Sequence, residues 1–144
     1  MAWYNDIDTT KKYRLGWTKS DVAGNEYIYL KGVASVVADD FVSYAENFAM
    51  SRTLADRVGP CGVAMSALDA ATKFGWAQIF GNGTVDSATV AADKALYLTA
   101  TAGRVDDTDV AGDLIHGMVS TGADATNSLP VRLNYPIVYD TAAD

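Results

Sequence analysis

The chain has 144 residues, of which 49% are hydrophobic and 20% are charged. That composition is typical of a globular domain and excludes a disordered chain. Lys and Arg number 11 against 18 Asp and Glu, which gives a net charge of -7. Nonspecific nucleic-acid binding depends on cations that displace counterions from phosphates, so we expect no nucleic-acid partner.

Cys61 is the single cysteine, so an intrachain disulfide and a multi-cysteine zinc site are excluded. The chain begins without a basic segment followed by an apolar stretch. No run approaches the roughly 18 apolar residues that are needed to span a bilayer. We therefore expect a protein that is made in the cytoplasm and does not associate with membranes.

The N-terminal third of the chain predicts a β-hairpin. Segments 13–17 and 26–31 are rich in aromatic and branched residues, which favour strands. The polar segment 21–25 between them contains Gly24 and Asn25, which tolerate the positive φ angles of turns. We expect the two strands to pair through this turn.

The following segment, 33–57, is ambiguous between strand and helix. It is rich in alanine, and the spacing of Ala45, Phe48, Ala49 and Arg52 suits a helix. We predict strands instead, with a turn at Asp39 and Asp40. The three strands expected here are 33–37, 41–44 and 47–53.

The strongest strand pattern of the chain lies at 74–80. It would place Phe74, Trp76, Gln78 and Phe80 on one face. The Asn-Gly pair in segment 81–84 is typical of a tight turn and predicts that the strand ends there. The other predicted strands of this part of the chain are 62–68, 88–90, 95–99, 114–119 and 131–135.

Many short strands with frequent glycine predict a mostly β fold. We expect a small barrel or sandwich of antiparallel strands, with room for one or two short helices. No linker or repeat divides the chain, so residues 13–144 are predicted to form a single domain. Residues 1–12 match no strand pattern and are predicted to form an N-terminal arm.

His116, the one histidine, is the first candidate for catalytic chemistry. A pair of Cys61 and His116 is conceivable in space, but Pro60-Cys61-Gly62 matches no nucleophile signature. We predict that the protein is not an enzyme and that it uses no cofactor. A small hydrolase centred on His116 is the alternative, and it requires the His116→Ala variant to lose a turnover.

The acidic segment 106–113 invites a calcium interpretation, because clustered carboxylates supply the oxygen ligands that Ca²⁺ prefers. Its spacing fails, since Ala111 and Met118 stand where calcium-binding loops have ligands. We expect a solvated acidic loop and no metal. Segment 81–86 also lacks the Lys-Ser/Thr ending of a phosphate-binding loop.

Aromatic residues are the remaining feature of the sequence. Trp17, Trp76 and Tyr97 fall in predicted strands, where we expect them to fill a core. Trp3 and Tyr4 precede any predicted strand. Two large rings near a terminus must either pack on their own domain or dock on a neighbouring molecule.

The region from about residue 32 to residue 139 resembles a family of small phage proteins that decorate or cement the head and are encoded beside the major capsid protein. The resemblance is carried by a pattern of small, aromatic and glycine positions. It implies a protein without enzymatic activity that binds the outer capsid surface of the virion, forms a homo-oligomer (a trimer is favoured) and stabilises the capsid by bridging its subunits. The segments that carry it are 62–64, 74–81, 95–105 and 133–136.

The partner implied by the resemblance is the major capsid protein, and contact by an ordered terminal arm is the expected mode of binding. We predict Trp3, Tyr4 and Tyr13 as the arm contact, with a second contact at Pro136, Ile137 and Tyr139. Deleting residues 1–10 is expected to leave a folded domain that no longer binds heads.

Two alternative functions remain open at this point. A head-fibre base or a tail component could use the same acidic β module, and copy number would separate these roles. A carbohydrate-binding β module would predict that Trp17 or Trp76 is exposed to stack on sugar rings.

Overall fold

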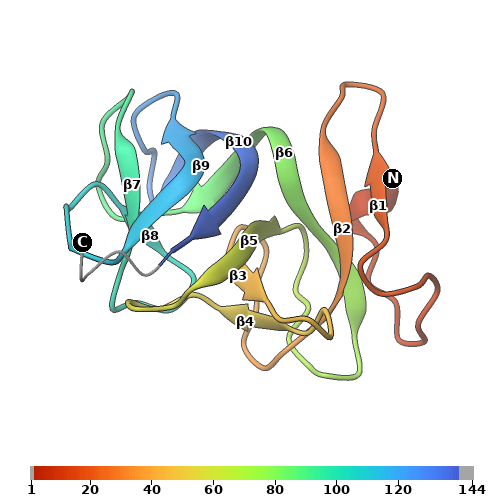
Figure 1. The fold of residues 1–144 in the computed structure, drawn as a ribbon. Helices are drawn as coiled ribbons and strands as arrows, with labels where there is room; N and C mark the ends of the chain where they lie inside the picture. The colour runs from red at the N-terminus through yellow and green to blue at the C-terminus, as the bar shows by residue number, and fades with distance from the viewer. Residues whose placement is uncertain (1, 140–144) are drawn as a thin grey trace.

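The computed structural model describes residues 2–139 and consists of ten strands in one antiparallel sheet (Figure 1). The mostly β prediction is confirmed. The 3-10 turn η1 (Trp3–Asn5) is the only helical element among these residues, so the short helices for which the sequence left room are not found in residues 2–139. The strand path does not close on itself, which leaves a sandwich-like arrangement and not a barrel. The strands are β1 (Thr18–Ser20), β2 (Glu26–Lys31), β3 (Phe41–Tyr44), β4 (Met50–Arg52), β5 (Gly59–Ala64), β6 (Phe74–Asp86), β7 (Ala95–Leu98), β8 (Val105–Asp106), β9 (Leu114–Ser120) and β10 (Ser128–Val138).

The predicted N-terminal hairpin is confirmed, although its first strand begins later than expected. β2 has the predicted bounds and pairs antiparallel with β1. Segment 13–17 turns instead of extending, because Gly16 has a φ of 85° and the Trp17 N–H donates to the Arg14 carbonyl. β1 therefore starts only at Thr18.

The ambiguous segment 33–57 contains strands and no helix. β3 has the predicted bounds, and β4 lies within the predicted strand 47–53. The strand predicted at 33–37 is wrong: Ser35 has a φ of 74°, which places a turn there. The predicted strand 88–90 is also absent: β6 ends at Asp86 and is followed by an isolated bridge between Ser87 and Val105.

The predicted turn at 81–84 is wrong, because β6 continues through it to Asp86. Gly81 adopts a φ of 104° and bends the strand without reversing it. The side-chain amide of Gln78 donates to the Phe80 carbonyl at 3.2 Å and to the Asn82 carbonyl at 3.0 Å, on either side of Gly81. The first part of β6 consequently pairs with β2, and the part beyond the bend pairs with β10.

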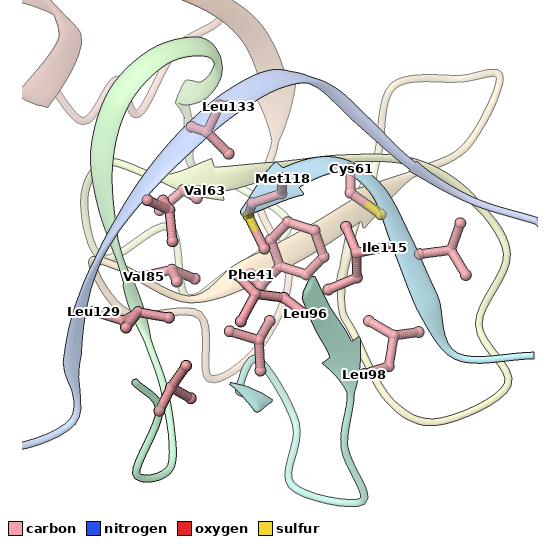
Figure 2. Close-up of a cluster of buried hydrophobic side chains, with 14 residues drawn as sticks. Phe41, Cys61, Val63, Val85, Leu96, Leu98, Ile115, Met118, Leu129 and Leu133 are labelled. Atoms are coloured by element: carbon pink, nitrogen blue, oxygen red, sulfur yellow. The ribbon is translucent and has the colours of Figure 1, made fainter. Parts of the chain in front are cut away.

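Both faces of the β2–β6 pair are covered. Ile28, Leu30, Ala77 and Ile79 pack toward β3 and β4 in one apolar cluster. The alternate residues pack on the opposite face in an aromatic cluster, as the period of two predicts. A third cluster lies between β3, β5, β6, β7, β8, β9 and β10, with the Phe41 ring among aliphatic side chains (Figure 2).

β9 and β10 change the face that they present to this core at one point. Leu133 pairs with Met118, but the next paired residues are Ile137 and His116. Gly117 (φ 78°) and Tyr135 (φ 53°) create the irregularity, and a Cβ at Gly117 would collide with the Asn134 carbonyl oxygen. Because Met118 and Ile115 both enter the core, His116 between them points away from it.

An ion pair joins the turn before β3 to β4. The Asp40 carboxylate is 1% exposed and accepts from Arg52 Nε at 2.9 Å and from the Val37 N–H at 3.0 Å. Arg52 also donates to the Ala102 carbonyl at 3.1 Å. These bonds hold three segments of the chain together.

Within residues 2–139, no helix has the length and apolar character needed to cross a membrane.

Candidate functional site

The N-terminal segment packs on the aromatic face of β2 and β6 through Trp3, Tyr4, Tyr13 and Leu15. The ring of Trp3 lies 5.0 Å from that of Trp76, measured between centroids, and Tyr4 stacks on Tyr27 at 4.7 Å. Tyr13 meets Tyr29 edge to face at 5.3 Å. The structure thus brings the three predicted arm residues together. We call the group of Trp3, Tyr4, Tyr13, Trp17, Tyr27, Tyr29 and Trp76 the aromatic surface.

Polar contacts hold this N-terminal segment in place. The Asp8 backbone exchanges two 2.8 Å hydrogen bonds with Phe74, the first residue of β6. The Tyr29 hydroxyl donates to the Asp8 carboxylate at 2.6 Å. Lys19 Nζ lies 4.3 Å from the Trp3 ring centroid, a cation–π contact. Trp3 and Tyr4 are half-buried as a result.

Trp17 and β1 form the exposed border of the aromatic surface, at one edge of the sheet (Figure 1). Trp17 is 49% exposed, and every residue of β1 is exposed. The Trp17 carbonyl accepts from the Tyr29 N–H, so the backbone groups of Thr18 and Ser20 point away from β2. The sequence assigned Trp17 to the core; Gly16, which turns the chain just before it, is the signal that could have corrected this.

The predicted second contact lies on β10, and its residues differ in exposure. Pro136 is buried, Ile137 is half-buried, and Tyr139 is 53% exposed, with its ring 5.1 Å from that of His116. Ile137 pairs with Pro60 and His116. The structure does not bring these residues onto the aromatic surface, and Pro136 offers no exposed surface for a partner.

Cys61 and His116 point to opposite sides of the sheet and do not form a nucleophile pair. Cys61 packs in the core beside Ile115 and Val138, the side from which His116 is turned away. Burial raises the pKa of the Cys61 thiol to about 12, so the thiol stays protonated at neutral pH. Trp76 is buried, as the sequence predicts, and Tyr97 is half-buried.

The raised pKa predicts an unreactive thiol in the folded protein. At pH 8 we expect Cys61 to react with a disulfide reagent more than about 100-fold slower in buffer than in denaturant, because burial both blocks access and disfavours the thiolate. Raising the pH from 7 to 9 should keep the folded protein in the slow regime, since the pKa lies above that range. Equal rates in buffer and denaturant would show that Cys61 is accessible.

The acidic segment contributes one structural carboxylate. Asp113 is buried and accepts the Asp56 N–H at 2.7 Å, which anchors the loop before β5. Asp106 accepts the Thr108 N–H in a local turn. Across residues 2–139, no group of three or more His, Cys, Asp or Glu side chains is placed to hold a metal ion.

A pocket of about 380 Å³ adjoins the aromatic surface where β6 bends; we call it the β6 pocket. Burial raises the pKa of Asp39 on its rim, and the nearby Asp86 and Asp40 add to this, while the Thr84 hydroxyl that it accepts opposes it. Burial and the Asp21 carboxylate raise the pKa of Tyr27, which keeps its hydroxyl a donor. The pocket is lined by Tyr4, Asn25, Tyr27, Asp39, Met65, Gln78, Asn82, Gly83 and Thr84.

The β6 pocket was not predicted from the sequence to be a binding site. Asp39 was placed in a turn, which the structure confirms, and Gln78 on a strand face shared with Trp76. The chain matches no protein-family model and no curated protein sequence.

Proposed function

We propose that this chain is a nonenzymatic virion protein that binds the outer surface of a phage capsid and stabilises it by bridging capsid subunits. Its partners are the major capsid protein and further copies of itself, with a trimer as the favoured oligomer. The observation that carries the proposal is the open edge strand β1 beside the aromatic surface.

An edge strand with free backbone groups can pair with an extended segment of another chain, and neighbouring side chains then add specificity. Thr18 and Ser20 offer such groups, and Trp17 supplies a half-exposed ring next to them. Lys19 on the same strand discourages unspecific edge-to-edge association. When many copies bind to one capsid lattice, their weak individual contacts together give stable binding.

The resemblance to head-decoration proteins also supports this proposal, since the segments that carry it lie on β5, β6, β7 and β10 and in the connection from β7 to β8. β6 carries Trp76 of the aromatic surface, and all four strands contribute side chains to the core. The net charge of -7 keeps many accumulated copies from binding DNA unspecifically.

Co-sedimentation with heads assembled from the capsid protein encoded beside this chain tests the proposal. The wild type should reach saturating occupancy, and Trp17→Ala should weaken binding about tenfold or more, because truncating an aromatic anchor at an interface typically costs over 1 kcal/mol. The ring is half-exposed, so the variant should fold as the wild type does.

Val119→Ala is the matched control, since Val119 is 47% exposed on β9, several strands away from β1 in the sheet. We expect it to bind heads as well as the wild type. Absence of wild-type binding, or equal losses in both variants, would contradict the proposed docking surface. Occupancy of a few tens of copies or fewer per particle would favour a head-fibre base or tail component.

The exposure of Trp17 also favours the carbohydrate-binding alternative, which requires an exposed tryptophan. Saturable quenching of tryptophan fluorescence by a glycan, lost in Trp17→Ala, would support that function instead. Trp76 is buried and is not available to a sugar.

A further inference from the structure

The β6 pocket contains a hydrogen-bond acceptor to which no group in residues 2–139 donates. Gln78 is only 2% exposed, and its amide nitrogen already donates to the Phe80 and Asn82 carbonyls. Its amide oxygen lies close to Gly83, which also lines the pocket. Among residues 2–139, no group donates a hydrogen bond to this oxygen, so it can accept one from a ligand.

Asp39 supplies a second acceptor, and its backbone is firmly held. Its N–H donates to the Ala64 carbonyl, and its carbonyl accepts from the Asp86 N–H. The φ of 73° is a conformation that Asp and Asn tolerate better than most residues. The carboxyl group is thus carried to the pocket rim by a backbone that does not need to rearrange when a ligand binds.

The charge of Asp39 has no cation beside it in the described part of the chain. Asp40 is bound by Arg52 at 2.9 Å, and Asp86 faces Arg104 at 3.4 Å. Asp39 accepts only the Thr84 hydroxyl, at 3.3 Å. Asp39 is a half-buried carboxylate with two other aspartates near it, an environment that a bound cation would stabilise.

The aromatic wall of the pocket favours one kind of cation. The rings of Tyr4 and Tyr27 stack nearly parallel, and both residues line the pocket together with Met65. A guanidinium group is flat, weakly hydrated and able to donate several hydrogen bonds in its plane while its face lies on a ring. An ammonium group can also lie over a ring, but it lacks the flat array of donors that would reach two acceptors in one plane.

We propose that the β6 pocket binds the guanidinium group of an arginine side chain from a protein partner. The arginine donates to Asp39 and to the Gln78 amide oxygen and lies against the Tyr4 ring. The identity of that partner as a capsid subunit rests on the proposed function, whereas the chemistry of the pocket does not.

Titration with arginine ethyl ester, followed by backbone amide NMR, tests the pocket itself. Saturable shifts are expected at Asn82, Gly83 and Thr84, with binding at least about fivefold tighter than for lysine ethyl ester. Asp39→Asn should weaken arginine ester binding by a similar factor, because it removes the charge and keeps the shape. Asn suits the backbone conformation at this position, so the variant should fold.

Asp69→Asn is the matched control, since it removes the charge of an exposed aspartate in the loop between β5 and β6 that does not line the pocket. It should bind the arginine ester as the wild type does. Absence of saturable shifts, or equal losses in the two aspartate variants, would overturn the inference. Tighter binding of methyl glucoside than of arginine ester, unaffected by Asp39→Asn, would do the same in favour of a sugar.

Head binding by the same variants separates this inference from the proposed function. Asp39→Asn should weaken head binding at least about fivefold and reduce its dependence on salt, while Asp69→Asn should not. If heads bind wild type and Asp39→Asn equally, the pocket inference fails and the capsid role stands. If the arginine ester binds but heads do not, the capsid role fails and the pocket stands.

Discussion

Replacing Arg52 with methionine is expected to lower the free energy of unfolding by about 3 kcal/mol. The substitution removes the cation that lies 2.9 Å from Asp40 and leaves a carboxylate that is 1% exposed without its counterion. The donation to the Ala102 carbonyl is lost as well. Urea denaturation at pH 7, followed by tryptophan fluorescence, measures the loss.

Two further variants isolate the cause of this loss. Arg52→Met combined with Asp40→Asn should be less destabilised than Arg52→Met alone, because no unpaired charge remains buried. Lys73→Met breaks an exposed i,i+4 pair with Asp69 and should cost less than about 0.5 kcal/mol. Equal free energies of unfolding for Arg52→Met and Lys73→Met would show that the ion pair of Asp40 does not stabilise the fold.

Deleting residues 1–10 is expected to lower the free energy of unfolding by about 3 kcal/mol, because two half-buried aromatic rings at roughly 25 cal/mol per Å² outweigh the entropy regained by a short segment. The deletion uncovers Tyr27 and Trp76 and removes the hydrogen bonds between Asp8 and Phe74. This replaces the expectation that residues 1–10 can be removed without affecting the domain. Chemical denaturation and near-ultraviolet circular dichroism measure the change.

Trp17→Ala serves as the aromatic control for the deletion. Trp17 contacts Tyr13 edge to face at 5.4 Å but is 49% exposed, so its loss should cost less than about 1 kcal/mol. A deletion variant as stable as the wild type would show that residues 1–10 contribute nothing to the fold. Loss of head binding by that variant could then be assigned to the missing contact alone.

Segments whose neighbours decide their structure were predicted well. β2 has the predicted bounds, because aromatic and branched residues alternate there between polar residues. The alternation along 74–80 correctly separated the Trp76 face from the Ala77 face, since side chains of any strand point to opposite sides.

Segments whose structure depends on distant partners were predicted poorly. The Asn-Gly pair at 82–83 suits a turn locally, yet pairing with β10, about 50 residues later in the chain, keeps it in an extended strand. Gln78 stabilises the bend by donating to carbonyls on both sides of Gly81. No local pattern distinguishes these two outcomes.

The sequence by itself determined that this protein is acidic, mostly β, free of disulfides and rich in aromatic side chains. Only the tertiary structure decided that Trp3 and Tyr4 lie on Trp76 and Tyr27, that Trp17 is exposed, and that Tyr4, Asp39 and Gln78 meet in one pocket. Local preferences arise from neighbouring residues and can be read along the chain. The exposure of a side chain, and which side chains meet in one pocket, depend on contacts between segments far apart in sequence. Both are therefore decided only when the sheet has formed.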